Sequence, residues 1–567
     1  MSTAGKRELI AAARRVVFTG LIILGAWLLL LWLRGHIPES VIRTMLDEDQ
    51  APPSFYDSST WNWTRSLWTY EPVSELIGQR LGLTLKLIGL GGLLSLVIAS
   101  ILLLLGLLLS RVTERPGWLA QVRSILRLVL VSGGASIPVF IVGTFFIVFA
   151  VAGRNWTLPE NLAVAMFWSI LFSSLLPAWL LVQAGHGELT NMPENIPFLR
   201  MIPRLSTSLI IRLLRLVGVI IVITVSVEQV MAQPGLGRLI VSGLNQRDFQ
   251  VVFGIAWVYV IIVALTKLAA DLIEIASNHF GRQAVSAVPD TEQSVQRKGV
   301  PRGWLVFALA LVVISIIVAI VGPLLAPYGW NEISIQERLV APSAEHLVGT
   351  DNIGRDVLSR LLYGVRTDVF AGLICAGVLS VVATGWAMLA AYFRRLNNWA
   401  GDFLEDLVTL PAQIIVAFPW LVLLLLLMSM VSLGPRFLPV VPLVSSLVLL
   451  PRAVSMIQET YRLPPEGRGL FRSTLRAVPV MLIFTVAGGM LYISTASYLG
   501  LGVPPPFPEL GAMLTGAGMQ FLLKAPWMAL WPALCLVLLL LAWVMAGEAL
   551  LERLGFRTKA VWSKIME

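Results

Sequence analysis

Long apolar runs recur along the whole chain, and each is long enough to cross a lipid bilayer as a helix of about 20 residues. Of the 567 residues, 57% are hydrophobic and 13% are charged, against about 25% charged residues in an ordinary soluble domain. A soluble fold could not bury this much apolar surface, so we expect an all-α polytopic membrane protein. The expected spans are 16–33, 83–109, 125–152, 162–184, 208–230, 251–275, 304–326, 369–393, 408–432, 437–456, 478–499 and 530–551.

The twelve expected spans form two sets of six, separated by a polar stretch at 276–303 that lacks apolar periodicity and is typical of a linker. The first half is therefore expected at 1–275 and the second at 304–567. In each half a long external segment follows the first span, at 34–82 and at 327–368. We interpret the halves as repeats of one six-span unit.

The distribution of charge predicts the orientation of the halves. The net charge is +9, which could suit nucleic acid, but basic residues of membrane proteins collect in cytoplasmic loops. Arg and Lys are concentrated in the segments that are cytoplasmic if the N-terminus is inside, and the opposite segments are richer in acid. The rule predicts cytoplasmic termini, a cytoplasmic linker, a parallel repeat and no nucleic-acid partner.

The N-terminal run at 16–33 follows four basic residues, but no small-residue cleavage site comes after it. We therefore expect an uncleaved first span rather than a signal peptide.

The sequence contains no recognisable catalytic motif. It has no phosphate-binding Gly-x4-Gly-Lys-Ser/Thr loop, no nucleophile elbow and no spaced metal ligands. The two cysteines, Cys375 and Cys535, lie in apolar runs, as packing residues do. We expect a chain that is not an enzyme and that itself binds no cofactor or metal.

Few charged residues fall inside the expected spans. Most of these lie near span ends and can snorkel to the interface: Lys86, Lys267, Asp271, Glu274, Glu405 and Asp406. Glu228 lies deeper, at the end of the fifth span. It is a candidate for a role in a pore, or it is a helix-end carboxylate whose hydrogen bonds are all satisfied.

A glycine-rich segment follows the fifth span of each half, with the sequences QPGLGRLI at 233–240 and YLGLGVPPP at 498–506. Glycine permits positive φ or close backbone approach, and proline stiffens a turn. Each segment is a rigid turn, or it is the lip of an external pore mouth where another protein docks.

The sequence GTDNIGRDVL at 349–358 contains turn formers before an apolar pattern. We expect a short amphipathic helix over RDVLSRLLYG, lying on the outer membrane face.

Several motifs resemble one family. The sequences EHLVGTDNIGRDVLSRLLYGVRTDV at 345–369 and YLGLGVPPPFPELGAML at 498–514 resemble external motifs of the smaller inner-membrane permease of bacterial oligopeptide, dipeptide and nickel ABC importers. The sequence EQVMAQPGLGRLIVSGLNQRDFQVV at 228–252 resembles the companion permease. The resemblance covers nearly the whole chain and implies that both permeases are fused in one polypeptide of the bacterial inner membrane.

The resemblance also implies partners and site residues. An external binding protein would deliver peptides or similar small solutes, and cytoplasmic ATPases, which hold ATP and Mg, would drive transport. The implied pore-mouth residues are Pro234, Gly235, Gly237, Gly349, Asp351, Gly354, Arg355, Asp356, Gly500, Gly502 and Pro504.

The chain departs from the family in its coupling loops, which normally carry Glu-Ala-Ala and a following glycine. The corresponding segments, 186–206 and 457–477, lack this pattern and contain prolines, including Pro203, that we expect to break helices. The candidate ATPase-contacting residues there are Glu188, Arg200, Arg204, Glu459, Arg468 and Arg472. Either the loops have diverged and still dock an ATPase, or the chain is a degenerate permease that serves as a non-transporting scaffold.

Overall fold

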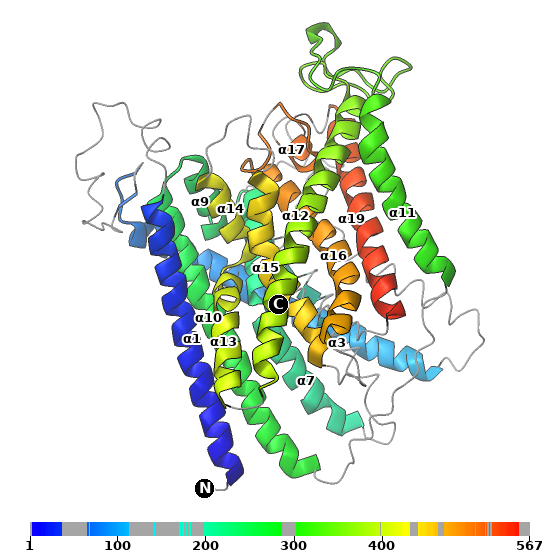
Figure 1. Ribbon diagram of the computed structural model, residues 1–567. Helices are drawn as coiled ribbons and strands as arrows, with labels where there is room; N and C mark the ends of the chain where they lie inside the picture. The colour runs from blue at the N-terminus through cyan, green and yellow to red at the C-terminus, as the bar shows by residue number, and fades with distance from the viewer. Residues whose placement is uncertain are drawn as a thin grey trace.

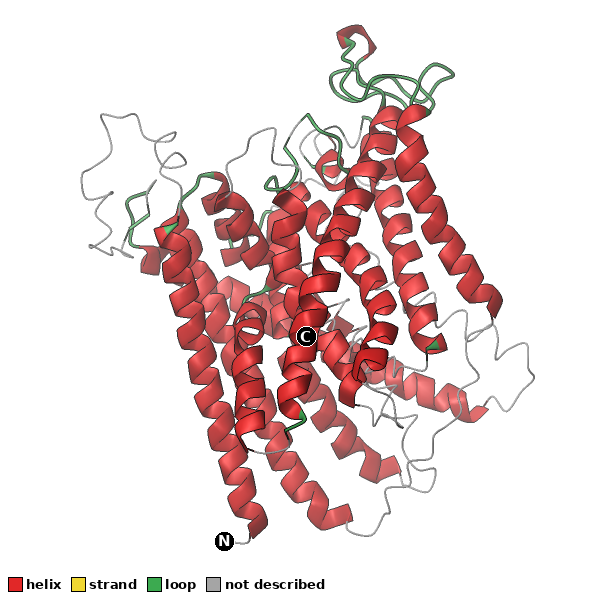
Figure 2. Cartoon of the chain, viewed as in Figure 1, coloured by secondary structure: helices red, strands yellow, loops and turns green. Residues whose placement is uncertain are grey.

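The computed structural model describes most of the chain. The described residues are 3–36, 65–66, 69–112, 141, 169–171, 173–174, 177–178, 181–182, 198–285, 302–396, 399–430, 440–462, 470–504, 506–515, 518, 521 and 524–554. Within these ranges the chain forms helices and loops (Figure 2), with a single isolated β-bridge between Thr350 and Asp356.

The protein is an all-α membrane protein. Eight helices of the described part are long and apolar enough to cross a membrane, and two bent helix pairs raise the number to as many as ten. The helices of the first half are α1 (Thr3–Gly35), α3 (Val73–Val112), α7 (Phe198–Arg215), α8 (Val217–Val230), α9 (Leu236–Asn245) and α10 (Phe249–Val285). Those of the second half are α11 (Arg302–Val321), α12 (Val357–Arg394), α13 (Trp399–Ala417), α14 (Trp420–Met430), α15 (Val440–Arg462), α16 (Leu470–Tyr498), α17 (Leu510–Leu514) and α19 (Trp527–Arg553). The 3₁₀ turns η2 (Gly322–Leu324) and η3 (Ile335–Glu337) lie between α11 and α12.

Ten of the expected spans have a counterpart among these helices and bent pairs. The expected span 125–152 lies outside the described residues except for position 141, and 162–184 does so in large part. The total of twelve therefore stays a prediction. The expected linker begins too early, because α10 continues as far as Val285. The helix extends past the apolar run because backbone hydrogen bonding needs no apolar side chains.

The expected interfacial helix at RDVLSRLLYG is wrong. These residues form the first turns of α12, which runs without a break from Val357 to Arg394. Asp356 caps the helix by accepting a hydrogen bond from the amide of Ser359 at 2.7 Å. Val357 and Leu361 are buried in the protein, so this segment is part of a span rather than a helix lying on the membrane.

The two halves pack against each other over α1, α8, α9 and α10 on one side and α13 and α14 on the other. Figure 1 shows α1 beside α13, and Arg14 of α1 forms an ion pair with Asp406 of α13. One apolar core cluster contains residues of both halves, such as Leu30 and Leu421. The halves therefore form one body.

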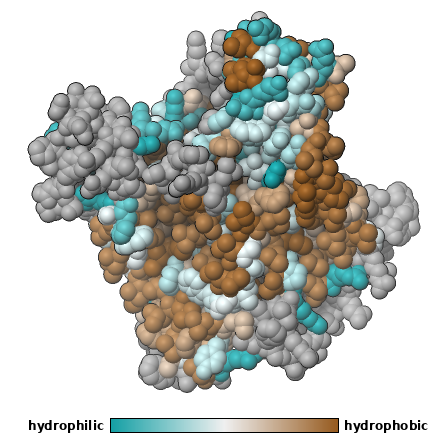
Figure 3. All heavy atoms as spheres, turned by 45° about the horizontal axis from the view of Figure 1, so that its top comes forward, coloured by the Kyte–Doolittle hydropathy of each residue, from teal (hydrophilic) through white to brown (hydrophobic). Residues whose placement is uncertain are grey.

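The outer surface is largely apolar. In the view of Figure 3, hydrophobic side chains cover the flanks of the molecule, and hydrophilic ones gather toward the top. Helix α11 exposes Val306, Phe307, Val313, Ile314 and Ile317. Such a surface suits contact with lipid, since lipid tails are as apolar as these side chains.

Several charged side chains near span ends form ion pairs. Arg215 donates to Asp271 at 3.0 Å and to Glu274 at 2.5 Å, and Arg15 lies 3.3 Å from Asp271. We expected Asp271 and Glu274 to snorkel. They instead link α1, α7 and α10 through ion pairs.

Candidate functional site

Two bent helix pairs meet where the halves join. Helices α7 and α8 are bent by 58° at Leu216, and α13 and α14 by 87°; each pair is a broken span or a re-entrant loop. The second break follows from Pro419, which has no amide hydrogen and disfavours helical geometry at the preceding residue, Phe418. Irregular backbone at membrane depth is tolerated where protein shields it or a cavity adjoins it.

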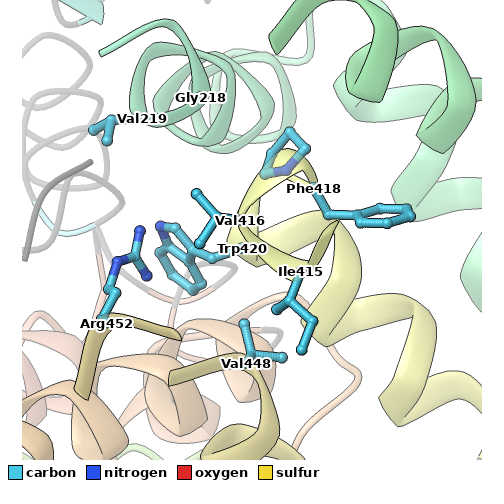
Figure 4. A pocket seen from close by; sticks show the side chains of 9 residues that line it. Gly218, Val219, Ile415, Val416, Phe418, Trp420, Val448 and Arg452 are labelled. Carbon is cyan, nitrogen blue, oxygen red and sulfur yellow. The ribbon is translucent and has the colours of Figure 1, made fainter. Parts of the chain in front are cut away.

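A pocket lies at this junction (Figure 4). Its lining residues are Gly218 and Val219 from α8, Ile415, Val416, Phe418, Pro419 and Trp420 from the α13–α14 bend, and Val448 and Arg452 from α15. The cavity volume is about 20 Å³, which is room for about one water molecule. Residues of both halves contribute to the wall of this pocket.

Arg452 brings a positive charge to this otherwise apolar wall. Its Nη1 donates a hydrogen bond to the hydroxyl of Tyr492 on α16. The ring of Tyr492 stacks on that of Trp420, with centroids 4.0 Å apart and planes 1° apart. In Figure 4 the guanidinium lies beside the Trp420 side chain. The bend after α13 is thus connected to α15 and α16 through these three residues.

The sequence analysis missed Arg452. It is the sole charged residue of the expected span 437–456, which is a signal for function by default. Tyr492 and Trp420 carried no comparable signal, because aromatic residues are common in spans.

Glu228 lies in α8 and is completely buried. Its carboxylate accepts hydrogen bonds from Thr84 Oγ1 at 2.7 Å and from the amide of Gly237 at 2.5 Å. Thr84 Oγ1 in turn accepts from the amide of Leu236 at 2.9 Å. These contacts hold the first turn of α9 against α3 and α8, and Glu228 does not line the pocket. A pore role for Glu228 stays a prediction, and the contacts match the helix-end alternative.

The second half holds its own short helix in a similar way. The amide of Leu510, the first residue of α17, donates to Asp368 of α12 at 3.3 Å. Glu509 caps α17 by accepting from the amides of Gly511 at 2.9 Å and Ala512 at 2.7 Å. The contact of Leu510 with the second span of its half corresponds to that of Leu236 with Thr84.

The end of the fifth span is also alike in both halves. In α16 the amides of Gly500 and Leu501 donate to the carbonyls of Ser497 and Ala496, and Gly500 has φ +85°. This is the Schellman arrangement that ends a helix.

In α8 the same two bonds are present. The amides of Ala232 and Gln233 donate to the carbonyls of Gln229 and Glu228, with Ala232 at φ +53°. Ala232 therefore corresponds to Gly500.

The correspondence extends into the two turns. Gly235 and Gly237 match Glu509 and Gly511, because Leu236 and Leu510 are the equivalent first residues of α9 and α17. A β-carbon on Gly237 would overlap the backbone of Val225, and one on Gly511 would overlap that of Ser494. Gly237 lies five positions after Ala232, whereas Gly511 lies eleven positions after Gly500, so the second turn contains six extra residues, 502–507.

The extra residues and the neighbouring Pro508 are held by Trp330, in the loop before α12, and by α12 itself. Phe507 stacks on Trp330, with ring centroids 5.4 Å apart. Arg360 Nη1 donates to the carbonyl of Pro506 at 3.4 Å, and Thr367 Oγ1 donates to that of Pro508 at 2.9 Å. Pro504 lies within this insertion and, through its carbonyl, accepts from the amide of Phe507 at 3.2 Å.

The other expected pore-mouth residues of the second half stabilise a compact loop. Asp351 accepts from the amide of Arg355 at 3.0 Å and from its Nε at 2.7 Å. Asp356 contacts His346 Nδ1 at 3.0 Å in addition to capping α12. Gly349 and Gly354 have φ of +86° and +82°. The carbonyl of Thr350 accepts from Trp527 Nε1 at 3.0 Å, which ties the loop to α19.

The external motifs of the two halves approach each other at one point. A β-carbon on Gly500 would lie 3.9 Å from Oδ1 of Asn245, the last residue of α9. Pro234, Gly235 and Gly237 lie at the other end of α9 and immediately before it, where a β-carbon on Gly235 would overlap the Glu228 carboxylate.

The expected coupling residues are described only in part. Glu188 and Arg468 lie outside the described residues. Arg200 and Arg204 lie on α7, Glu459 near the end of α15 and Arg472 near the start of α16. The expected break at Pro203 is wrong, because α7 runs through it. Pro203 is the sixth residue of the helix, where its missing amide removes one intrahelical bond, to the carbonyl of Leu199.

No three His, Cys, Asp or Glu side chains of the described residues are placed to hold a metal ion. The site therefore offers an apolar pocket with one cationic group, built from both halves.

The chain is similar to permease proteins of peptide transport systems. It is 29% identical over 279 residues to the dipeptide transport system permease protein DppC of Haemophilus influenzae, covering 92% of that protein and 46% of this chain. It is 30% identical over 265 residues to the glutathione transport system permease protein GsiD of Pectobacterium atrosepticum, covering 85% and 44%. A DppC protein of Alkalihalophilus pseudofirmus is 27% identical over 273 residues, or 86% and 45%. No family model matches the chain.

Proposed function

Because the chain belongs to the family of permease proteins of peptide and glutathione transport systems, we propose that it forms the translocation pathway of an ABC importer in the bacterial inner membrane. Peptides or similar small solutes are the expected cargo. The pocket between the bent spans of the two halves is the observation that carries this proposal, because a passage through a two-part permease must run between its parts.

The same proposal includes the fusion of two permeases in one polypeptide. Each relative covers nearly a whole permease but less than half of this chain. The paired contacts of Leu236 with Thr84 and of Leu510 with Asp368 support a second permease unit in the remaining half. Residues 286–301, between α10 and α11, would form the cytoplasmic connection.

Two kinds of partner complete the importer. An external binding protein would deliver the solute to the end of the molecule that carries the 325–356 loop, which lies at the top of Figure 1. Cytoplasmic ATPases, which bind ATP and Mg themselves, would dock at 186–206 and 457–477. The basic residues of these segments suit an acidic partner surface, and lipid headgroups are the competing partner for arginine.

Charge reversal tests this proposal. Arg200→Glu and Arg468→Glu should abolish co-purification of an ATPase and stimulation of its hydrolysis, while the chain still inserts in the membrane. If lipid is the partner, the complex survives and orientation or expression suffers. If the native chain neither binds an ATPase in mild detergent nor supports uptake of a dipeptide, the transport proposal is refuted in favour of the scaffold.

A further inference from the structure

Arg452 lies inside its membrane span. It is twelve residues beyond Val440, the first residue of α15, which corresponds to about 18 Å along the helix axis. The hydrocarbon core of a bilayer is about 30 Å thick. Arg452 lies six residues, or about 9 Å along the helix axis, before the other end of the span at Gln458. It is therefore a charge inside the span, and such a charge is retained when it has a partner or a function.

The protein supplies only part of the bonding that this guanidinium requires. Nη1 is engaged by Tyr492. Nε is buried and has no hydrogen-bond partner among the described residues. Among the residues that the structure describes, no carboxylate lies within 4.0 Å of the guanidinium nitrogens of Arg452. The described surroundings thus leave both the positive charge and the Nε edge available.

The surroundings of Arg452 fit a planar anionic group. The stacked rings of Trp420 and Tyr492 restrain the guanidinium on the side of Nη1. The edge with Nε is the one that presents two parallel N–H groups to a carboxylate. Ser445 lies on the same face of α15, three residues before the pocket residue Val448 and seven before Arg452. Its buried hydroxyl has no partner among the described residues.

We propose that Arg452, in the pocket between the halves, binds the carboxylate of a solute during its passage through the membrane. This inference rests on the proposed function. An unmodified peptide carries a carboxylate at its C-terminus, and Arg452 would hold it bidentately while the apolar wall contacts the side chains. The alternative is that Arg452 merely braces α15 against α16 through Tyr492.

A labelling experiment on the purified full chain tests binding without transport. In a Cys375→Ala, Cys535→Ala background, Val448→Cys places a thiol in the pocket. It is reacted with an anionic methanethiosulfonate that carries a sulfonate and with a cationic one that carries a trimethylammonium. The measured quantity is the labelling rate with the anionic reagent divided by that with the cationic reagent. We expect Arg452→Gln to lower this ratio about tenfold, because one positive charge near the thiol is lost. Arg452→Lys should keep most of the preference.

Protection by a solute identifies the group that is recognised. The dipeptide alanyl-alanine should slow labelling by the neutral reagent methyl methanethiosulfonate, whereas its C-terminal amide should protect at least tenfold less. Arg452→Gln should remove this difference. Equal protection by acid and amide, or an unchanged rate ratio in Arg452→Gln, would overturn the proposal.

Two controls separate binding from bracing. Tyr492→Phe removes the hydroxyl but keeps the charge, so the preference for the acid should persist; if it disappears as in Arg452→Gln, bracing is the role. Arg366→Gln removes an exposed arginine of α12 and should change neither readout. Failure of the transport proposal would appear as absent uptake in the unmodified chain, and the labelling result would still decide the role of Arg452.

Discussion

The amide of Leu510 donates a hydrogen bond to the carboxylate of Asp368, and this bond ties the short helix α17 to the second span of its half. Asp368 is completely buried and also accepts from Ser494 Oγ at 3.4 Å. Removal of the Asp368 carboxylate would leave the buried amide of Leu510 without a hydrogen-bond acceptor. Such a loss costs about 1–3 kcal/mol.

We therefore expect Asp368→Ala to lower the free energy of unfolding by about 1–3 kcal/mol. Thermal unfolding of the purified chain in detergent measures the change. Asp368→Asn keeps an acceptor of similar shape and should cost less. If the alanine and asparagine variants were equally stable, the bond to Leu510 would contribute nothing.

A side chain at Gly511 should disrupt the packing of α17. A β-carbon there would overlap the backbone of Ser494, and overpacking of this kind typically costs about 1–3 kcal/mol. Gly511→Ala should lower both the unfolding temperature and the yield of folded protein. Gly377→Ala is the matched control, because nothing lies within 4 Å of a β-carbon at that position of α12. Similar losses in both variants would contradict the close approach.

The two equivalent helix ends allow a reciprocal exchange. Ala232 has φ +53° and Gly500 has φ +85°, and a β-carbon in left-handed geometry costs about 1–2 kcal/mol. Ala232→Gly should raise the free energy of unfolding by about 0.5–1 kcal/mol, because the gain is partly offset by the flexibility of glycine. Gly500→Ala should lower it by a comparable amount. Calorimetry or thermal unfolding would report both, and shifts of the same sign would argue against the equivalence.

The topology is open to a labelling test in cells. We expect the segment between α10 and α11 to be cytoplasmic because of its basic excess. A cysteine at Ser294 should react with membrane-impermeant reagents only after the cells are opened. A cysteine at Ala344, which is exposed in the loop before α12, should react in intact cells. Labelling of Ser294→Cys in intact cells would reverse the proposed orientation.

The sequence was sufficient for the class of fold and for most span positions, since the bilayer requires long apolar helices whatever their partners are. It was insufficient where contacts connect distant residues. The ion pair of Arg215 with Asp271 joins positions 56 residues apart, so charges expected to snorkel are in fact paired. The beginning of α12 was missed because Asp356 caps it well before the apolar run begins.

The candidate site was harder to predict from the sequence, because its contacts also connect residues that are distant along the chain. Pro419 indicates a helix break. The 87° angle between α13 and α14, and the contact of this break with the bend at Leu216, depend on packing between the halves. The correspondence of Gly237 with Gly511 was hidden by six inserted residues, because two similar glycine pairs competed for the match. Arg452 carried a signal that single-sequence reasoning could have used, because a charged residue inside a span marks a candidate functional site.

The insertion at 502–507, fastened beneath Trp330 through Phe507, makes the two sides of the molecule unequal. A surface made of two identical units could bind a partner in two orientations that differ by a rotation of half a turn, and the two orientations would be equivalent. Among the described residues, the turn after α8 has no counterpart of this insertion, so a partner would meet different surfaces at the two turns. The insertion thereby removes the two-fold equivalence of a chain that is built from two similar units.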